Sequence, residues 1–112
     1  MIKAVFDLNE NKVDVLIQDH AGAGEHGHDL VCASASTLTY TIIQNVSDYR
    51  QYGFFRKPPK VTTRDGYASI ICYPKRKCRE TVLDMFRVIE RGFQLLEHNY
   101  PNNVQVKSFG NA

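Results

Sequence analysis

Long apolar runs are absent from this chain. No segment approaches the roughly 20 consecutive apolar residues that a helix needs to cross a bilayer, and the N-terminal residues contain no such stretch. We therefore expect a soluble protein that has no membrane partner and no targeting segment. The 112 residues also lack repeats, low-complexity tracts and an interdomain linker, so we expect one domain over residues 1–112.

Cysteine is scarce as well. The chain has three cysteines, Cys32, Cys72 and Cys78. An odd count leaves at least one thiol unpaired, which argues against a secreted domain held together by disulfides. A reducing, cytoplasmic location fits this composition best.

The net charge of +2 hides two halves of opposite sign. Residues 1–49 hold two lysines against seven acidic residues, whereas residues 50–91 hold eleven basic residues against four acidic ones. The acidic half favours a basic polypeptide partner, and the basic middle favours nucleic acid, although ordinary solvated faces explain both. The basic side chains that would carry an RNA-binding function are Arg56, Lys57, Lys60, Arg64, Lys75, Arg76, Lys77 and Arg79, with Tyr67 or Tyr73 to stack on bases.

Apolar periodicity divides the chain into alternating strands and helices. Period-two alternation predicts strands at residues 2–8 and 13–17, and apolar residues at steps of three or four predict helices at residues 30–49 and 82–96. Asp65-Gly66 separates two further strands, at residues 61–63 and 67–73, and a last strand follows at residues 104–107.

The resulting order is ββαββαβ. Each predicted helix has one apolar stripe and each strand has one apolar face, so we expect an α+β two-layer sandwich in which a mainly antiparallel sheet packs against two helices. The aromatic residues Tyr52, Phe54 and Phe55 follow the first helix. They could form an exposed apolar loop or fold back onto the core.

The segment from Asp19 to Ser36 carries the chemistry. It contains three histidines, glycine breaks and Cys32, between a strand and a helix. Asp29 is a suitable N-cap, which puts Cys32 in the first turn, where the positive helix end favours a thiolate. The unpaired amides of this first turn could also receive an oxyanion.

A nucleophilic thiolate needs a proton acceptor that later returns the proton, and imidazole suits both tasks. His20 is the best candidate because it ends a strand, whereas His26 and His28 lie inside the glycine-bearing part of the segment. Asp29 and Asp19 are both candidate orienters of His20, and the sequence does not separate their roles.

Two other interpretations compete with a catalytic one. Cys32 could be an ordinary buried cysteine at a helix start, with histidines on the surface. His26, His28, Cys32 and His20 could instead bind Zn²⁺, although the paired short Cys/His spacings of structural zinc sites are missing. A catalytic Cys–His pair needs no cofactor and no metal.

At this segment the chain resembles the bacterial ribosomal-processing cysteine protease family, Prp. The resemblance lies in His20-Ala21, the glycine-bearing segment, and then the run Gly27-His28-Asp29-Leu30-Val31-Cys32-Ala33 with Ser36 four residues after the cysteine. It extends more loosely over almost the whole chain through length and element order.

The resemblance implies a cysteine endopeptidase that removes a short N-terminal extension from large-subunit ribosomal protein twenty-seven during ribosome assembly. Cleavage would follow a pair of aromatic residues, and the enzyme would be a homodimer. Cys32 would be the nucleophile and His20 the base, with Asp29 and Ser36 as supports of the site. Gly22, Gly24 and Gly27 would let a mobile loop open for substrate.

One position departs from the family pattern. The family usually has glycine immediately before the catalytic histidine, and this chain has Asp19. A carboxylate there could orient His20 and raise its basicity, or it could crowd the loop and alter its motion.

Overall fold

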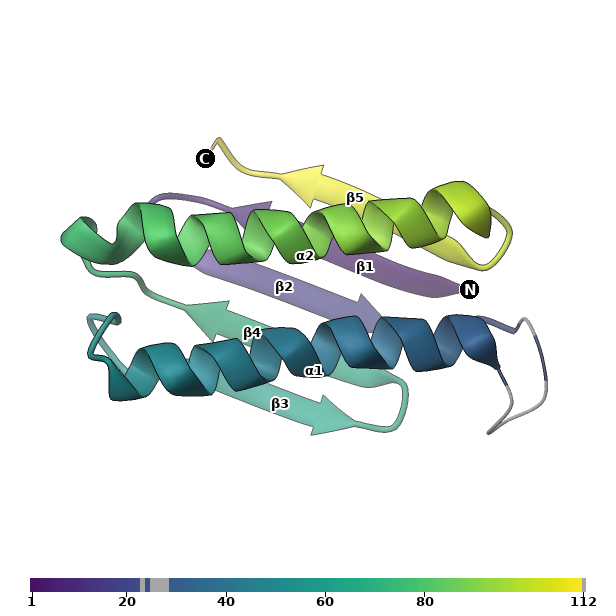
Figure 1. Cartoon of the computed structure of the whole chain (residues 1–112), viewed down its shortest axis with the longest axis horizontal. Helices are drawn as coiled ribbons and strands as arrows, with labels where there is room; N and C mark the ends of the chain where they lie inside the picture. The colour runs from purple at the N-terminus through teal and green to yellow at the C-terminus, as the bar shows by residue number, and fades with distance from the viewer. Residues whose placement is uncertain (23, 25–28, 112) are drawn as a thin grey trace.

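A computed structural model of the chain describes residues 1–22, 24 and 29–111. Figure 1 shows two helices lying side by side across one sheet. The elements are, in chain order, β1 (Ile2–Leu8), β2 (Val13–Gln18), α1 (Leu30–Gln51), β3 (Lys60–Arg64), β4 (Tyr67–Cys72), a short 3₁₀ helix η1 (Arg76–Cys78), α2 (Arg79–Asn99) and β5 (Val104–Phe109).

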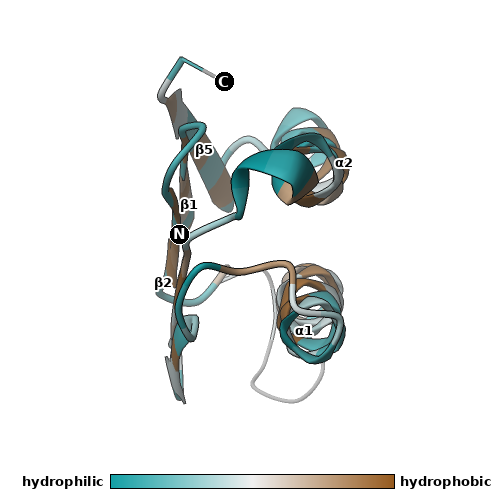
Figure 2. Ribbon diagram, turned by 90° about the vertical axis from the view of Figure 1, so that its left-hand side faces the viewer, coloured by the Kyte–Doolittle hydropathy of each residue, from teal (hydrophilic) through white to brown (hydrophobic). Residues whose placement is uncertain are grey.

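The five strands form one sheet in the order β3-β4-β2-β1-β5. The edge strand β5 pairs with β1 in parallel, while the β1–β2, β2–β4 and β3–β4 pairs are antiparallel. Both helices cover the same face of the sheet, as the side view in Figure 2 shows. This is the predicted α+β two-layer sandwich with the predicted ββαββαβ order.

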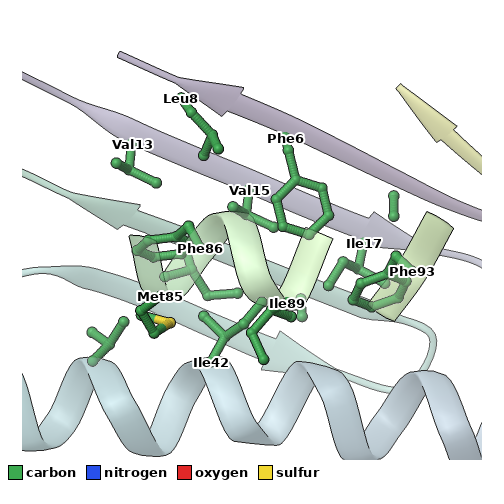
Figure 3. Packing of buried hydrophobic residues seen from close by; sticks show 14 of the residues in the cluster. Phe6, Leu8, Val13, Val15, Ile17, Ile42, Met85, Phe86, Ile89 and Phe93 are labelled. Atoms are coloured by element: carbon green, nitrogen blue, oxygen red, sulfur yellow. The ribbon is translucent and has the colours of Figure 1, made fainter. Parts of the chain in front are cut away.

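Strand alternation decides which side chains enter the core. Every second residue of β1 and β2 is buried under the helices, and Phe6 and Val15 are buried completely. The residues between them are exposed or partly exposed. The helices add Ile42 from α1 and Phe86 and Phe93 from α2. Figure 3 shows these aliphatic and aromatic side chains interleaved between the layers.

Element boundaries differ slightly from the predictions. Helix α1 extends to Gln51, two residues beyond the predicted end, because the amides of Tyr52 and Gly53 still bond to carbonyls of the last turn. Strand β5 continues to Phe109 because it pairs with β1 along its whole length. Neither long helix in the described residues is apolar enough to span a bilayer.

The aromatic group after α1 divides between the two expected placements. Phe55 is buried, Phe54 packs against Tyr49 with 5.1 Å between ring centroids, and Tyr52 is 65% exposed. The segment therefore folds back on the core through its phenylalanines and leaves one tyrosine on the surface.

The α2 ring Phe93 is expected to be a main support of the sandwich. Its centroid lies 5.7 Å from that of Phe6 on β1, and the side chain is fully buried. Phe93→Ala should therefore reduce the free energy of unfolding in urea by about 3–5 kcal/mol. Val88→Ala, on the exposed side of the same helix, should change it by less than about 0.5 kcal/mol. Similar losses in the two variants would contradict this packing.

Candidate active site

The start of α1 is fixed by one buried carboxylate. Asp29 has extended backbone angles, is 8% exposed, and its Oδ1 accepts hydrogen bonds from the amides of Val31 at 2.9 Å and Cys32 at 3.0 Å. Asp29 is therefore the predicted N-cap. Two of the first-turn amides that were expected to be available to an oxyanion, those of Val31 and Cys32, are thus bonded to the cap.

A second contact ties the thiol to the end of the sheet. The amide of Ala21 donates to Cys32 Sγ across 3.2 Å. Its carbonyl accepts a 2.9 Å hydrogen bond from Asn103 Nδ2, which comes from the turn between α2 and β5. The backbone of Ala21 is thus held through its carbonyl by a distant part of the chain, and its N–H group is directed at the sulfur.

The histidine after β2 lies beside the β3–β4 turn. His20 Nε2 is 3.8 Å from Asp65 Oδ2, and a Cβ added to Gly66 would come within 2.9 Å of the same nitrogen. The amide of Asp19 donates to the Gly66 carbonyl at 2.9 Å. Asp65, Gly66 and Asn103 were not among the predicted site residues.

The departure at Asp19 has a backbone explanation. Asp19 has a φ of +73° and is the one non-glycine residue with positive φ in the described part of the chain. This left-handed conformation is the one that glycine adopts without cost, and aspartate tolerates it better than most residues. Its side chain is exposed.

Cys32 and His20 line one groove, which has a volume of about 730 Å³ and lies between α1 and the β3–β4 hairpin. Ser36 and Tyr40 follow Cys32 at intervals of four residues, so all three share the groove-facing side of α1. The groove also receives the predicted site residues Asp19, Asp29, Gly22 and Gly24, and Arg64, Asp65 and Tyr67 from the hairpin. Gly27 lies outside the described residues.

The zinc interpretation receives no support from the side chains that the structure describes. Among them, no three His, Cys, Asp or Glu residues come together as a possible metal site. His26 and His28, on which that interpretation depends, lie outside the described residues.

The other two thiols differ from Cys32. Cys72 is fully buried in β4, and this burial raises the pKa of its thiol to about 12. Cys78 is partly exposed at the end of η1 and does not line the groove. Of the three, Cys32 alone combines partial exposure, a helix start and an amide directed at sulfur.

Several cations of the basic middle are engaged within the molecule. Lys57 Nζ lies 4.1 Å from the centroid of Tyr73, and the Arg64 guanidinium stacks 3.6 Å above Tyr67. Arg56 and Arg79 both bond to the β1–β2 turn at Asn11. One face of each candidate base-stacking tyrosine is therefore covered by a cation of this chain, an arrangement that favours a structural role for these cations.

The fold and groove define a small α+β protein with a thiol and an imidazole beside a helix start. The family model described as cysteine protease Prp matches residues 1–105. The chain therefore belongs to the Prp family of cysteine proteases.

Solved structures agree with this assignment. One is an essential ribosomal processing protease Prp from S. aureus in complex with a covalently linked product peptide, with 26% identity, a TM-score of 0.75 and coverage of 96% of this chain and 99% of that one. Another is SMU.848 from Streptococcus mutans, with 29% identity, a TM-score of 0.70 and coverage of 99% and 96%. No curated protein sequence matches significantly.

The left-handed backbone at Asp19 predicts a stability gain on Asp19→Gly. Relief of the positive φ, less the larger unfolded-state entropy of glycine, should raise the free energy of unfolding by about 0.5–1 kcal/mol. Asp14→Gly, inside β2, should lower it instead. Urea unfolding of both variants measures the difference, and a destabilised Asp19→Gly protein would show that this backbone conformation is not the native one.

The hydrogen bond from Asn103 to the Ala21 carbonyl predicts a measurable effect on the Cys32 thiol. Asn103→Ala releases the Ala21 carbonyl, so the amide directed at sulfur is less well held and alkylation of Cys32 by iodoacetamide at neutral pH should slow by a factor of about three to ten. Asn102→Ala, in the same turn, is the matched control and should leave the rate unchanged. Peptide mass spectrometry separates Cys32 from Cys72, which should stay unmodified until the protein unfolds. Equal alkylation rates in the two variants would contradict a role of Asn103 in holding the Ala21 amide against the sulfur.

Proposed function

We propose that this protein is a cysteine endopeptidase that removes the short N-terminal extension of large-subunit ribosomal protein twenty-seven, with Cys32 as nucleophile and His20 as base. The observation that carries the proposal is the placement of Cys32 Sγ in a groove, 3.2 Å from the Ala21 amide, with His20 lining the same groove. Membership of the Prp family and the S. aureus relative with its covalently linked product peptide support it.

The chemistry divides into two steps that share one base. His20 takes the thiol proton, Cys32 sulfur bonds to the scissile carbonyl carbon, and the carbonyl electron pair moves to oxygen. Collapse of this intermediate expels the amine, which takes the proton back from the imidazolium and leaves a thioester. Water, deprotonated by His20, then attacks the thioester and releases the carboxylic acid product and the thiol.

The groove has features that suit the proposed substrate. Apolar and aromatic side chains such as Ile17, Tyr40 and Tyr67 line it, which fits cleavage after aromatic residues. Its carboxylates, from Asp19, Asp29 and Asp65, outnumber its guanidinium group, so a basic polypeptide is the favoured partner.

The setting of the reaction is part of the same proposal. We infer that the enzyme acts in the cytoplasm, where ribosomal proteins are assembled, and that it works as a homodimer, as the family resemblance implies. No cofactor takes part. A non-enzymatic ribosome-associated or RNA-binding module remains the alternative prediction.

The proposal predicts that one thiol is essential for cleavage. Cys32→Ser and His20→Ala should each lower kcat/KM by at least about 100-fold on a peptide with two phenylalanines followed by alanine, because each removes a partner of the proton transfer. Cys78→Ala removes another partly exposed thiol outside the groove and should retain full activity. Circular dichroism checks that all three variants are folded. Undiminished cleavage by Cys32→Ser would refute the assignment.

A further inference from the structure

The turn between β3 and β4 lies directly against the imidazole of His20. The carboxylate of Asp65 faces Nε2 at 3.8 Å, within ion-pair distance. Gly66 makes the approach possible, since a Cβ on this residue would lie 2.9 Å from Nε2. One residue of the turn therefore supplies charge, and the other supplies the space that the ring occupies.

The sheet fixes the position of the Asp65-Gly66 turn relative to the histidine. Gln18, at the end of β2, pairs with Tyr67, the first residue of β4, and the Asp19 amide then bonds to the Gly66 carbonyl at 2.9 Å. His20 and Asp65 thus extend from the same end of one antiparallel pair. Because the register of that pair is set by buried residues on both strands, the backbone at Asp65 stays next to the backbone at His20.

Among the described residues, His20 is the cationic partner of the Asp65 carboxylate. Arg64, the preceding residue, stacks its guanidinium 3.6 Å above the Tyr67 ring. Within the part of the chain that the structure describes, His20 is the one basic side chain at ion-pair distance from Asp65. The negative charge of the turn is thereby directed toward the imidazole.

We propose that Asp65 is the positioning residue of the catalytic base, so that the site is the arrangement Cys32–His20–Asp65. A carboxylate at Nε2 favours the tautomer that carries its proton there, in which Nδ1 is the basic nitrogen that takes the thiol proton. The same carboxylate stabilises the imidazolium once that proton has moved. This inference rests on the proposed role of His20 as the base.

Exposure decides when the interaction becomes strong. In the substrate-free protein the side chains of His20 and Asp65 are 53% and 85% exposed, so water screens their attraction. Both line the groove, and a peptide bound there would displace water and strengthen the pair. Asp65 should therefore act on kcat more than on KM or on folding stability.

The turn offers a clean variant for the test. Gly66 has a φ of +66°, whereas Asp65 is not in the positive-φ region, so substitution at Asp65 adds no backbone strain. Asp65→Asn keeps a residue that favours turns before glycine and removes only the charge. Asp14→Asn makes the same charge change in β2, outside the groove.

We expect Asp65→Asn to lower kcat on the Phe-Phe-Ala peptide by about tenfold or more, with KM changed less than about twofold. Asp65→Glu restores the charge and should recover part of the loss, and Asp14→Asn should match the unmodified protein. A kcat of Asp65→Asn equal to that of Asp14→Asn would overturn the proposal.

A second measurement does not depend on the peptide substrate. Asp65→Asn should slow iodoacetamide alkylation of Cys32 in the native background and have no further effect in the His20→Ala background, because it acts through His20. An equal slowing in both backgrounds would show a merely structural role and would overturn the proposal. If the unmodified protein cleaves no peptide, the proposed function fails, and this alkylation cycle still decides the role of Asp65.

Discussion

The site depends on the contact between the Ala21 amide and the sulfur of Cys32. This 3.2 Å hydrogen bond joins the end of β2 to the first turn of α1, two parts of the chain that are eleven residues apart. Asp29 holds the helix side of the contact by capping α1, and Asn103 holds the sheet side through the Ala21 carbonyl. Each half of the contact therefore has its own anchor, Asp29 on the helix side and Asn103 on the sheet side.

The sheet positions the side chains on one side of the groove. The β2–β4 pairing brings the Asp65-Gly66 turn to His20, and the core of the sandwich contains the α2 rings Phe86 and Phe93 (Figure 3). The groove therefore has the β3–β4 hairpin on one side and the start of α1 on the other. Such a scaffold brings Cys32 and His20 to one groove from two different elements.

The sequence was sufficient for the features that depend on local pattern. Period-two and helical stripes predicted the element order, and the residue types at Asp29 and Cys32 predicted a capped helix with a thiol in its first turn. Asp65 and Asn103 could not be predicted, because they lie 45 and 83 residues from His20 in the sequence. Only the strand order β3-β4-β2-β1-β5 brings them close. The positive φ of Asp19 could not be predicted either. Its residue type suggested an effect of the carboxylate charge on His20, whereas the structure shows a left-handed backbone conformation at this position.

A peptide aldehyde ending in two phenylalanines tests the account most directly, because a nucleophilic thiol positioned in the groove adds to it tightly as a reversible hemithioacetal. We would measure the mass of the folded protein with the aldehyde at neutral pH under non-denaturing conditions, and locate the adduct by finding which cysteine the aldehyde protects from iodoacetamide. The account predicts one adduct per chain at Cys32, its absence in Cys32→Ser, and weaker binding in His20→Ala. An adduct at Cys78, or none at any thiol of a folded protein, would contradict it.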